Sequence, residues 1–186
     1  MLAKIGGFFR GLLEWVVVFA IAFLAVLAIR QFVIEPYTVP SASMEPTIQV
    51  GDNVLAQKVT LELGIDVEAG DIVVFENPDA TSSHDVLVKR VIAVGGQTVD
   101  LVDGVVYVDG VALDESYAQG SSYALSTQLA GVEVSYPYTV PEGCVWVMGD
   151  NRENSADSRY FGAVSCESLI GVVCARYWPL DRIGLL

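Results

Sequence analysis

The feature that most constrains this chain is an apolar run near its N-terminus. Residues 15–29 read WVVVFAIAFLAVLAI and contain no polar side chain, and Leu12 and Leu13 extend the run. Together they approach the about 20 residues that a helix needs to cross a bilayer. The alternative is a cleavable signal peptide, but the following stretch, RQFVIEPYTV, is too bulky for its cleavage site. We therefore predict a retained transmembrane signal anchor at residues 12–30.

The charges around this segment predict its orientation. Lys4 and Arg10 precede the run, which favours a cytoplasmic N-terminus, and Arg30 after it weakens the asymmetry without reversing it. Residues 1–11 are then the cytoplasmic N-terminus of a single-pass protein. Residues 31–186 form one extracytoplasmic domain, long enough to have its own core.

The acidity of the chain limits its partners. The formal net charge is −13, and every acid except Glu14 follows the apolar run. Nucleic acid is excluded as a partner because phosphate binding needs clustered Lys and Arg. The outer domain should also be repelled by anionic lipid headgroups, so contact with the lipid bilayer outside the anchor must be apolar. FVIEPYTV at residues 32–39 could supply that contact.

The outer domain has the pattern of a β protein. Short β-branched runs such as GDIVVF (70–75) and DVLVKRVIAV (85–94) alternate with turn residues. QTVDLVDGVVYVDGVAL has the form of a hairpin with Asp103-Gly104 at its turn. No long helical periodicity follows the anchor, so we predict a mainly β fold with a single antiparallel-β domain. Residues 114–138, rich in Ser, Tyr and Gly, are predicted to be a loop-rich insert.

A pair of serines stands between prolines just after the anchor, in VPSASMEPT at residues 39–47. The stretch is either a stiff polar spacer or a rigid support for reactive hydroxyls. A nucleophilic serine needs a base that accepts its proton. His84, in the polar loop DATSSHD, could act in a Ser-His-Asp triad, although a solvated histidine is the commoner outcome in such a loop.

Lysine is the other possible base, and the chain has Lys4, Lys58 and Lys89. Lys4 lies on the wrong side of the membrane, and Lys58 has polar neighbours that predict a solvated charge. Lys89 differs because a strand places it on one face with Leu87 and Val91. Full burial there would lower its pKa by the roughly 3 units that a base at neutral pH requires. A strand lysine that extends its amine to water remains the alternative.

A second polar cluster comes late, in GDNRENSADSRYFG at residues 149–162. It is either a solvated turn or part of a site. Asp157 and Arg159 are of the kind that form an ion pair, and the Ser155 hydroxyl could orient a neutral lysine without adding charge. A single histidine and no C-x-x-C pair make a metal site improbable, and a disulfide between Cys166 and Cys174 is possible.

Together these segments resemble the bacterial type I signal peptidases, the membrane-anchored Ser/Lys proteases. PSASMEPT is similar to the nucleophile segment of that family, P-S-x-S-M-x-P-T. GDIVVF, KRVIAVGG, GDNRENSADSRYFG and RYWPLDRIG are similar to its later segments. The resemblance covers nearly the whole chain, in the family's order and behind the expected anchor.

The resemblance implies a mechanism and roles for named residues. Ser43 would be the nucleophile, Lys89 the general base, Ser41 an oxyanion donor and Ser155 the group that orients Lys89. No metal or cofactor is implied. Structural support of the site would come from Asp157, Arg159, Asp150, Asn151 and Arg152.

The resemblance also implies the substrate. Exported preproteins would be cut at the outer face of the plasma membrane, after small residues at −1 and −3, in cooperation with the protein export machinery. Their backbone would add as a strand beside residues 37–41 and the Lys89 strand. The family's pocket walls correspond to Tyr37, Val39, Met44, Ile48, Val54, Val74 and Val88, although valines in such strands are also ordinary core residues.

Glu45, next to Met44, departs from many members of the family and could alter the cleft after the cleavage site. Two alternatives to a general signal peptidase stay open. One is a specialised Ser/Lys enzyme, either a maturation peptidase for a pilus or conjugation substrate or a self-cleaving repressor-like relative. The other is a membrane-tethered β binding module whose serines are only structural.

Overall fold

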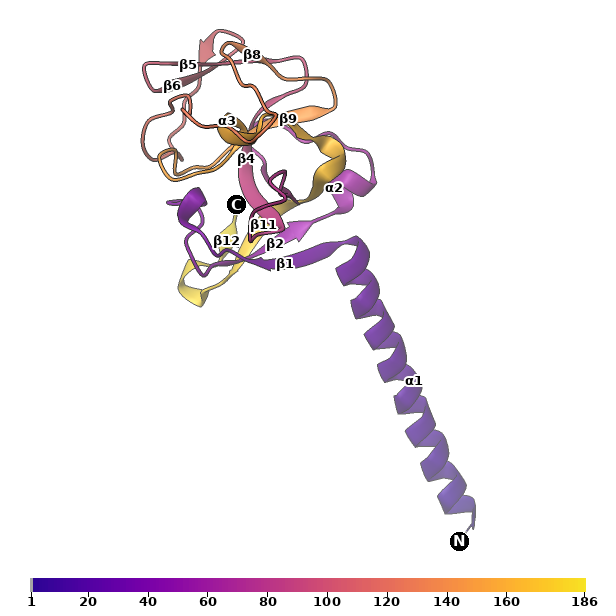
Figure 1. Ribbon diagram of the computed structural model, residues 1–186. Coiled ribbons are helices and arrows are strands. Elements are labelled where there is room, and N and C mark those ends of the chain that lie inside the picture. The colour runs from indigo at the N-terminus through magenta and orange to yellow at the C-terminus, as the bar shows by residue number, and fades with distance from the viewer. Residues whose placement is uncertain (1) are drawn as a thin grey trace.

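The computed structural model describes residues 2–186, with side chains from residue 15 onward. A single long helix, α1 (Leu2–Phe32), projects from a β domain (Figure 1). Its segment Trp15–Phe32 has a mean hydropathy of 2.2 and is not buried against protein, so it is long and apolar enough to cross a membrane. The helix extends beyond the predicted 12–30 at both ends.

Only Val33 separates α1 from the first strand, which begins at Ile34. The Val33 N–H donates to the carbonyl of Ile29 at 2.8 Å, which continues the helical pattern. The Val33 carbonyl accepts from the Lys58 N–H at 2.9 Å, which continues the pattern of the sheet. The helix therefore enters the domain through a junction that is hydrogen-bonded on both sides.

All strand pairs of the larger sheet are antiparallel, which confirms the predicted mainly β fold. The order is β1-β2-β11-β3-β4-β9-β10, with β12 beside β11. The strands are β1 (Ile34–Thr38), β2 (Asn53–Gln57), β3 (Ile72–Glu76), β4 (Val86–Val94), β9 (Cys144–Met148), β10 (Val164–Ser165), β11 (Leu169–Trp178) and β12 (Gly184–Leu185).

A smaller sheet lies at the end of the domain away from α1 (Figure 1), in the order β7-β6-β5-β8. Its predicted hairpin turns at Asp103-Gly104, where both residues have positive φ, as a two-residue turn of this kind requires. Between β7 and β8 the described residues form no helix or strand, and this span holds the predicted insert 114–138 except for Tyr138, which begins β8. The strands are β5 (Thr98–Val102), β6 (Val105–Val108), β7 (Val111–Ala112) and β8 (Tyr138–Thr139).

The helices of the outer domain are all short. Two are α-helical and three are 3-10 turns. They are η1 (Ala42–Met44), α2 (Val59–Glu62), α3 (Ser158–Phe161), η2 (Cys166–Ser168) and η3 (Leu180–Arg182).

The two faces of β4 and β9 are covered by separate hydrophobic clusters. Val91 and Val147 point into one cluster, and Ile92 and Trp146 into the other. All four are at most 2% exposed. On the same strand β4, Lys89 is 2% exposed. The three cysteines are free, so the possible Cys166–Cys174 disulfide is absent.

Candidate active site

The serine segment forms the short 3-10 helix η1 soon after Pro40. Ser43 lies in η1, and the next residue, Met44, is fully buried in a third hydrophobic cluster together with Val39. The polar loop at residues 149–162, the late loop, also contacts this turn. The Asn151 N–H donates to the Ser43 carbonyl at 3.0 Å, and its side-chain amide donates to the Ala42 carbonyl at 3.2 Å. The backbone that carries Ser43 is thereby held by a segment far away in the sequence.

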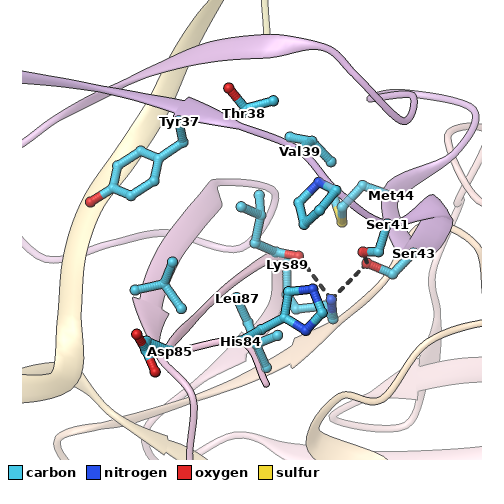
Figure 2. Close-up of a pocket in the computed structure, with 13 residues that line it drawn as sticks. Tyr37, Thr38, Val39, Ser41, Ser43, Met44, His84, Asp85, Leu87 and Lys89 are labelled. Atoms are coloured by element: carbon cyan, nitrogen blue, oxygen red, sulfur yellow. Dashed lines mark hydrogen bonds between the residues drawn. The ribbon is translucent and has the colours of Figure 1, made fainter. Parts of the chain in front are cut away.

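Lys89 is 2% exposed, so its amine does not extend to water. Its Nζ lies 2.8 Å from Ser43 Oγ and 3.0 Å from the Val88 carbonyl, and Figure 2 shows both contacts as dashed lines. Burial lowers the pKa of Lys89 from 10.5 to about 8, although the carboxylates of Asp157 and Asp150 act in the opposite direction. A large fraction of the amine is therefore neutral in mildly alkaline solution, and it points at a hydroxyl.

Two further serines lie beside this pair. Ser41 Oγ is 3.4 Å from Ser43 Oγ. Ser155 Oγ is buried and has no hydrogen-bond partner among the described residues. In this structure Ser43 and the Val88 carbonyl, and not Ser155, hold the Lys89 amine.

Asp150 joins the late loop to the strand that carries Lys89. It accepts two bonds from Arg90, from Nε at 2.8 Å and from Nη2 at 2.7 Å, and a third from Thr47 Oγ1 at 2.5 Å. Asp150 is 0% exposed, so these three bonds are made inside the protein. Bidentate pairs of this kind are the strong ones, and this pair fixes the loop against β4.

The ion pair that the sequence predicts between Asp157 and Arg159 is present. Arg159 Nη2 and Nε each lie 2.9 Å from the Asp157 carboxylate. Asp157 also caps α3 and accepts from the Gly149 N–H at 3.0 Å. Arg159 donates further to the Arg152 carbonyl at 2.7 Å. Both charges are at most 1% exposed, so the pair ties the two ends of the late loop together inside the protein.

The insert contributes contacts that sequence reasoning missed. Arg152 donates to both oxygens of Glu115, at 2.6 and 2.8 Å, and to Ser122 Oγ at 2.6 Å. The Tyr117 ring lies under the guanidinium of Arg90, 4.1 Å from ring centroid to Cζ. Residues 115–122 therefore hold the late loop in place.

A cavity of about 250 Å³, the first cavity, opens beside Ser43 and Lys89 (Figure 2). Most of its surface is apolar. Four predicted pocket residues line it, namely Tyr37, Val39, Met44 and Val88, together with Thr38, Pro40, Ser41, His84, Asp85, Val86 and Leu87.

The other three predicted pocket residues lie elsewhere. Ile48, Val54 and Val74 are 0% exposed and belong to the hydrophobic cluster that also contains Val39 and Met44. They support the wall of the first cavity from behind.

The two rejected bases also have defined positions. His84 is exposed at the edge of the first cavity, with Nδ1 3.2 Å from Ser83 Oγ and no bond to Ser43. Lys58 is not a free solvated charge as predicted, since its Nζ lies 2.7 Å from the Glu35 carboxylate. In the part of the chain that the structure describes, no group of three His, Cys, Asp or Glu is placed to hold a metal ion.

Comparison with known proteins gives the family. The family model described as "Signal peptidase, peptidase S26" matches residues 12–178. The chain belongs to the type I signal peptidases. It is therefore a serine peptidase that removes signal peptides, and α1 makes it a membrane-anchored protein.

Two curated relatives resemble most of the chain. "Probable signal peptidase I-2" of Synechocystis is 41% identical over 169 residues, which are 89% of this chain and 72% of that protein. "Signal peptidase IB" of Staphylococcus aureus is 34% identical over 182 residues, 93% of either chain. A solved signal peptidase I of Enterococcus faecalis is 32% identical and covers 57% of this chain and 96% of its own, with a TM-score of 0.43.

Proposed function

We propose that this signal peptidase cuts exported preproteins with a Ser43/Lys89 dyad, after small residues at −1 and −3, at the outer face of the plasma membrane. The observation that supports the dyad best is the 2.8 Å distance between Lys89 Nζ and Ser43 Oγ. It is joined by the near-complete burial of Lys89, which lowers the pKa of its amine. Nucleophile and base are within proton-transfer distance.

The mechanism has two steps. Neutral Lys89 takes the proton from Ser43 Oγ as that oxygen attacks the carbonyl carbon of the scissile bond. The Lys89 ammonium then gives this proton to the leaving amine, which leaves an acyl-enzyme on Ser43. Lys89 next deprotonates a water molecule that attacks the acyl carbonyl, and the proton returns to Ser43 Oγ.

The oxyanion that forms in each step needs hydrogen-bond donors. The Ser41 hydroxyl, adjacent to Ser43 Oγ, and the Ser43 N–H are the proposed donors. Removal of one such donor typically raises the barrier by about 3–4 kcal/mol. Ser155, whose buried hydroxyl has no hydrogen-bond partner among the described residues, is proposed to orient the Lys89 amine toward Ser43. Asp150, Asn151, Arg152, Asp157 and Arg159 are the proposed structural supports.

Two strand edges border the first cavity and support binding of the substrate as an extended strand. The Val39 N–H donates to the Asp52 carbonyl, and the Val39 carbonyl accepts from the Gly51 N–H. Because hydrogen-bonding groups alternate in direction along an antiparallel strand, the N–H and carbonyl of Thr38 face the free edge. By the same alternation Val88 directs its N–H away from β3, while its carbonyl accepts from Lys89. A substrate strand between Thr38 and Val88 would place small side chains in the first cavity.

The proposed orientation follows from the charges of the N-terminus. With Lys4 and Arg10 in the cytoplasm, α1 spans the bilayer and residues 31–186 lie outside. Preproteins reach that side through the export machinery while still attached to the bilayer by their signal peptides. The proposed localisation is therefore the same membrane that the substrates cross.

The test uses the full chain in detergent micelles with a preprotein that has Ala at −1 and −3. Ser43→Ala and Lys89→Met should each abolish cleavage, and Lys89→Arg should fail too because arginine stays protonated. Lys58→Met, which removes a lysine outside the cavity, should cleave at the wild-type rate. Cleavage that survives Lys89→Met would contradict the dyad. A panel of preproteins separates a general enzyme, which cuts most of them, from a specialised one.

A further inference from the structure

A second cavity lies on the other side of the dyad. Its volume is about 260 Å³, and it shares Ser41, Ser43, His84, Leu87 and Lys89 with the first cavity. The rest of its wall comes from the loop between β3 and β4 and from the late loop with α3. These residues are Asn77, Asp79, Ser82, Asn154, Ala156, Tyr160 and Phe161. Ser43 thus lies where two cavities of different character meet.

A polypeptide cut at Ser43 must continue on both sides of the scissile bond. Under the proposed function the residues before the bond occupy the first, apolar cavity, so the chain after the bond leads into the second. We propose that the second cavity binds the side chain at +1 and prefers one that donates a hydrogen bond over one that carries a carboxylate. This inference rests on the proposed function and extends it to the mature part of the substrate.

The preference derives from Asp79. Of the described residues that line the second cavity, Asp79 is the one with a carboxylate. Its Oδ1 accepts from the Thr81 N–H at 2.9 Å and from Thr81 Oγ1 at 2.6 Å. Its Oδ2 has only a long contact of 3.4 Å from the Tyr160 hydroxyl among the described residues, so it can accept from a substrate. The Thr81 bonds lower the pKa of Asp79, so this group is ionised when the enzyme works.

The other groups around the second cavity do not cancel this charge. Lys89 must be neutral to act as the base, and none of the described residues that line the cavity is an arginine. The amide of Asn77 is already used, since Nδ2 donates to the His84 carbonyl at 2.8 Å and Oδ1 accepts from the Asp79 N–H at 3.0 Å. Asn77 therefore shapes the loop that presents Asp79, and the carboxylate decides which side chain is preferred.

The test is a series of peptides with Ala at −1 and −3 that differ only in the residue at +1, which is Lys, Gln, Leu or Asp. With the full chain in neutral detergent, we expect kcat/KM for the Lys peptide to exceed that for the Asp peptide about twofold to fivefold, the range for a partly exposed charge contact. Asp79→Asn should bring this ratio close to one. Asp79→Lys should invert it, a result that loop damage cannot produce. Glu76→Gln, which removes a carboxylate outside the second cavity, should keep the wild-type ratio.

Each outcome decides a different question. Equal cleavage of all four peptides by the wild type, or an unchanged ratio in Asp79→Lys, would overturn the inference and leave the proposed function intact. A second series varies the residue at −2 instead of +1, and its kcat/KM ratios should not change in Asp79→Lys. A change in those ratios would mean that the second cavity binds residues before the scissile bond. If the wild type cleaves none of the peptides, the proposed function fails together with the inference.

Discussion

Gly149 and Ser155 are packed so closely that a Cβ on Gly149 would lie 2.3 Å from Ser155 Oγ. The same Cβ would lie 2.4 Å from the Ser43 carbonyl. The glycine is therefore required by the approach of two segments of the proposed site. Its φ is not in the left-handed region, so space and not backbone strain limits what fits there.

Gly149→Ala should accordingly displace both serines. We expect loss of cleavage and a decrease of about 1–3 kcal/mol in the free energy of unfolding, as for other overpacked interiors. Gly184→Ala is the matched control, because a Cβ there meets no atom within 4 Å. Preprotein cleavage and thermal melting of the two variants provide the comparison. An active Gly149→Ala enzyme would show that the serines need not be held this closely.

The activity of the enzyme should follow the titration of Lys89. The pKa of about 8 means that the amine is mostly protonated at pH 6 and mostly neutral at pH 9. We expect kcat/KM to rise about tenfold per pH unit below the pKa and to level off above it. A pH–rate profile on one peptide checks this. A profile that is flat between pH 6 and 8 would mean that another group is the base.

The same burial of Lys89 should lower the free energy of unfolding at neutral pH. Below pH 8 the amine is protonated in both folded and unfolded chains, so the full cost of burying its charge is present. Between pH 8 and 10.5 the unfolded chain still binds the proton that the folded chain has lost, so stability rises with pH. Lys89→Met should therefore be inactive yet more stable at pH 7, by about 3 kcal/mol. Melting curves should show this gain shrinking from pH 8 to 10.

Glu115 should be essential for holding the late loop. Arg152 is 1% exposed on its side chain, and Glu115→Gln would leave that charge buried with weaker partners. We expect a loss of about 3 kcal/mol in stability and a slower cleavage rate. Glu35→Gln breaks the Lys58 pair, whose carboxylate is 37% exposed, and should cost less than about 1 kcal/mol. Equal melting temperatures for the two variants would contradict a supporting role for the insert.

Local patterns in the sequence predicted much of this structure. The strand that contains Lys89 follows from its run of β-branched residues, and the hairpin of β5 and β6 follows from Asp103-Gly104, because both signals are local. From Leu87 and Val91 alone, a buried Lys89 and a Lys89 that extends its amine to water were both possible. Packing on both faces of β4 settled it.

Contacts between distant segments could not be predicted in this way. Nothing near Arg152 indicates that its partner is Glu115, 37 positions away, because the insert between them has no regular periodicity. The spacing of Val54 and Val74 likewise could not separate a cavity wall from the core behind it. The second cavity depends on the loop around Asp79 meeting Tyr160, 81 positions away, so it became visible only in three dimensions.

The junction at Val33 has a consequence for the reach of the enzyme. The Val33 N–H bonds back into α1 and the Val33 carbonyl accepts from Lys58, the residue after β2, so no unbonded linker lies between the helix and the sheet. Under the proposed orientation, this junction would fix the height of Ser43 above the bilayer. The anchor would then set how far from the membrane a preprotein is cut.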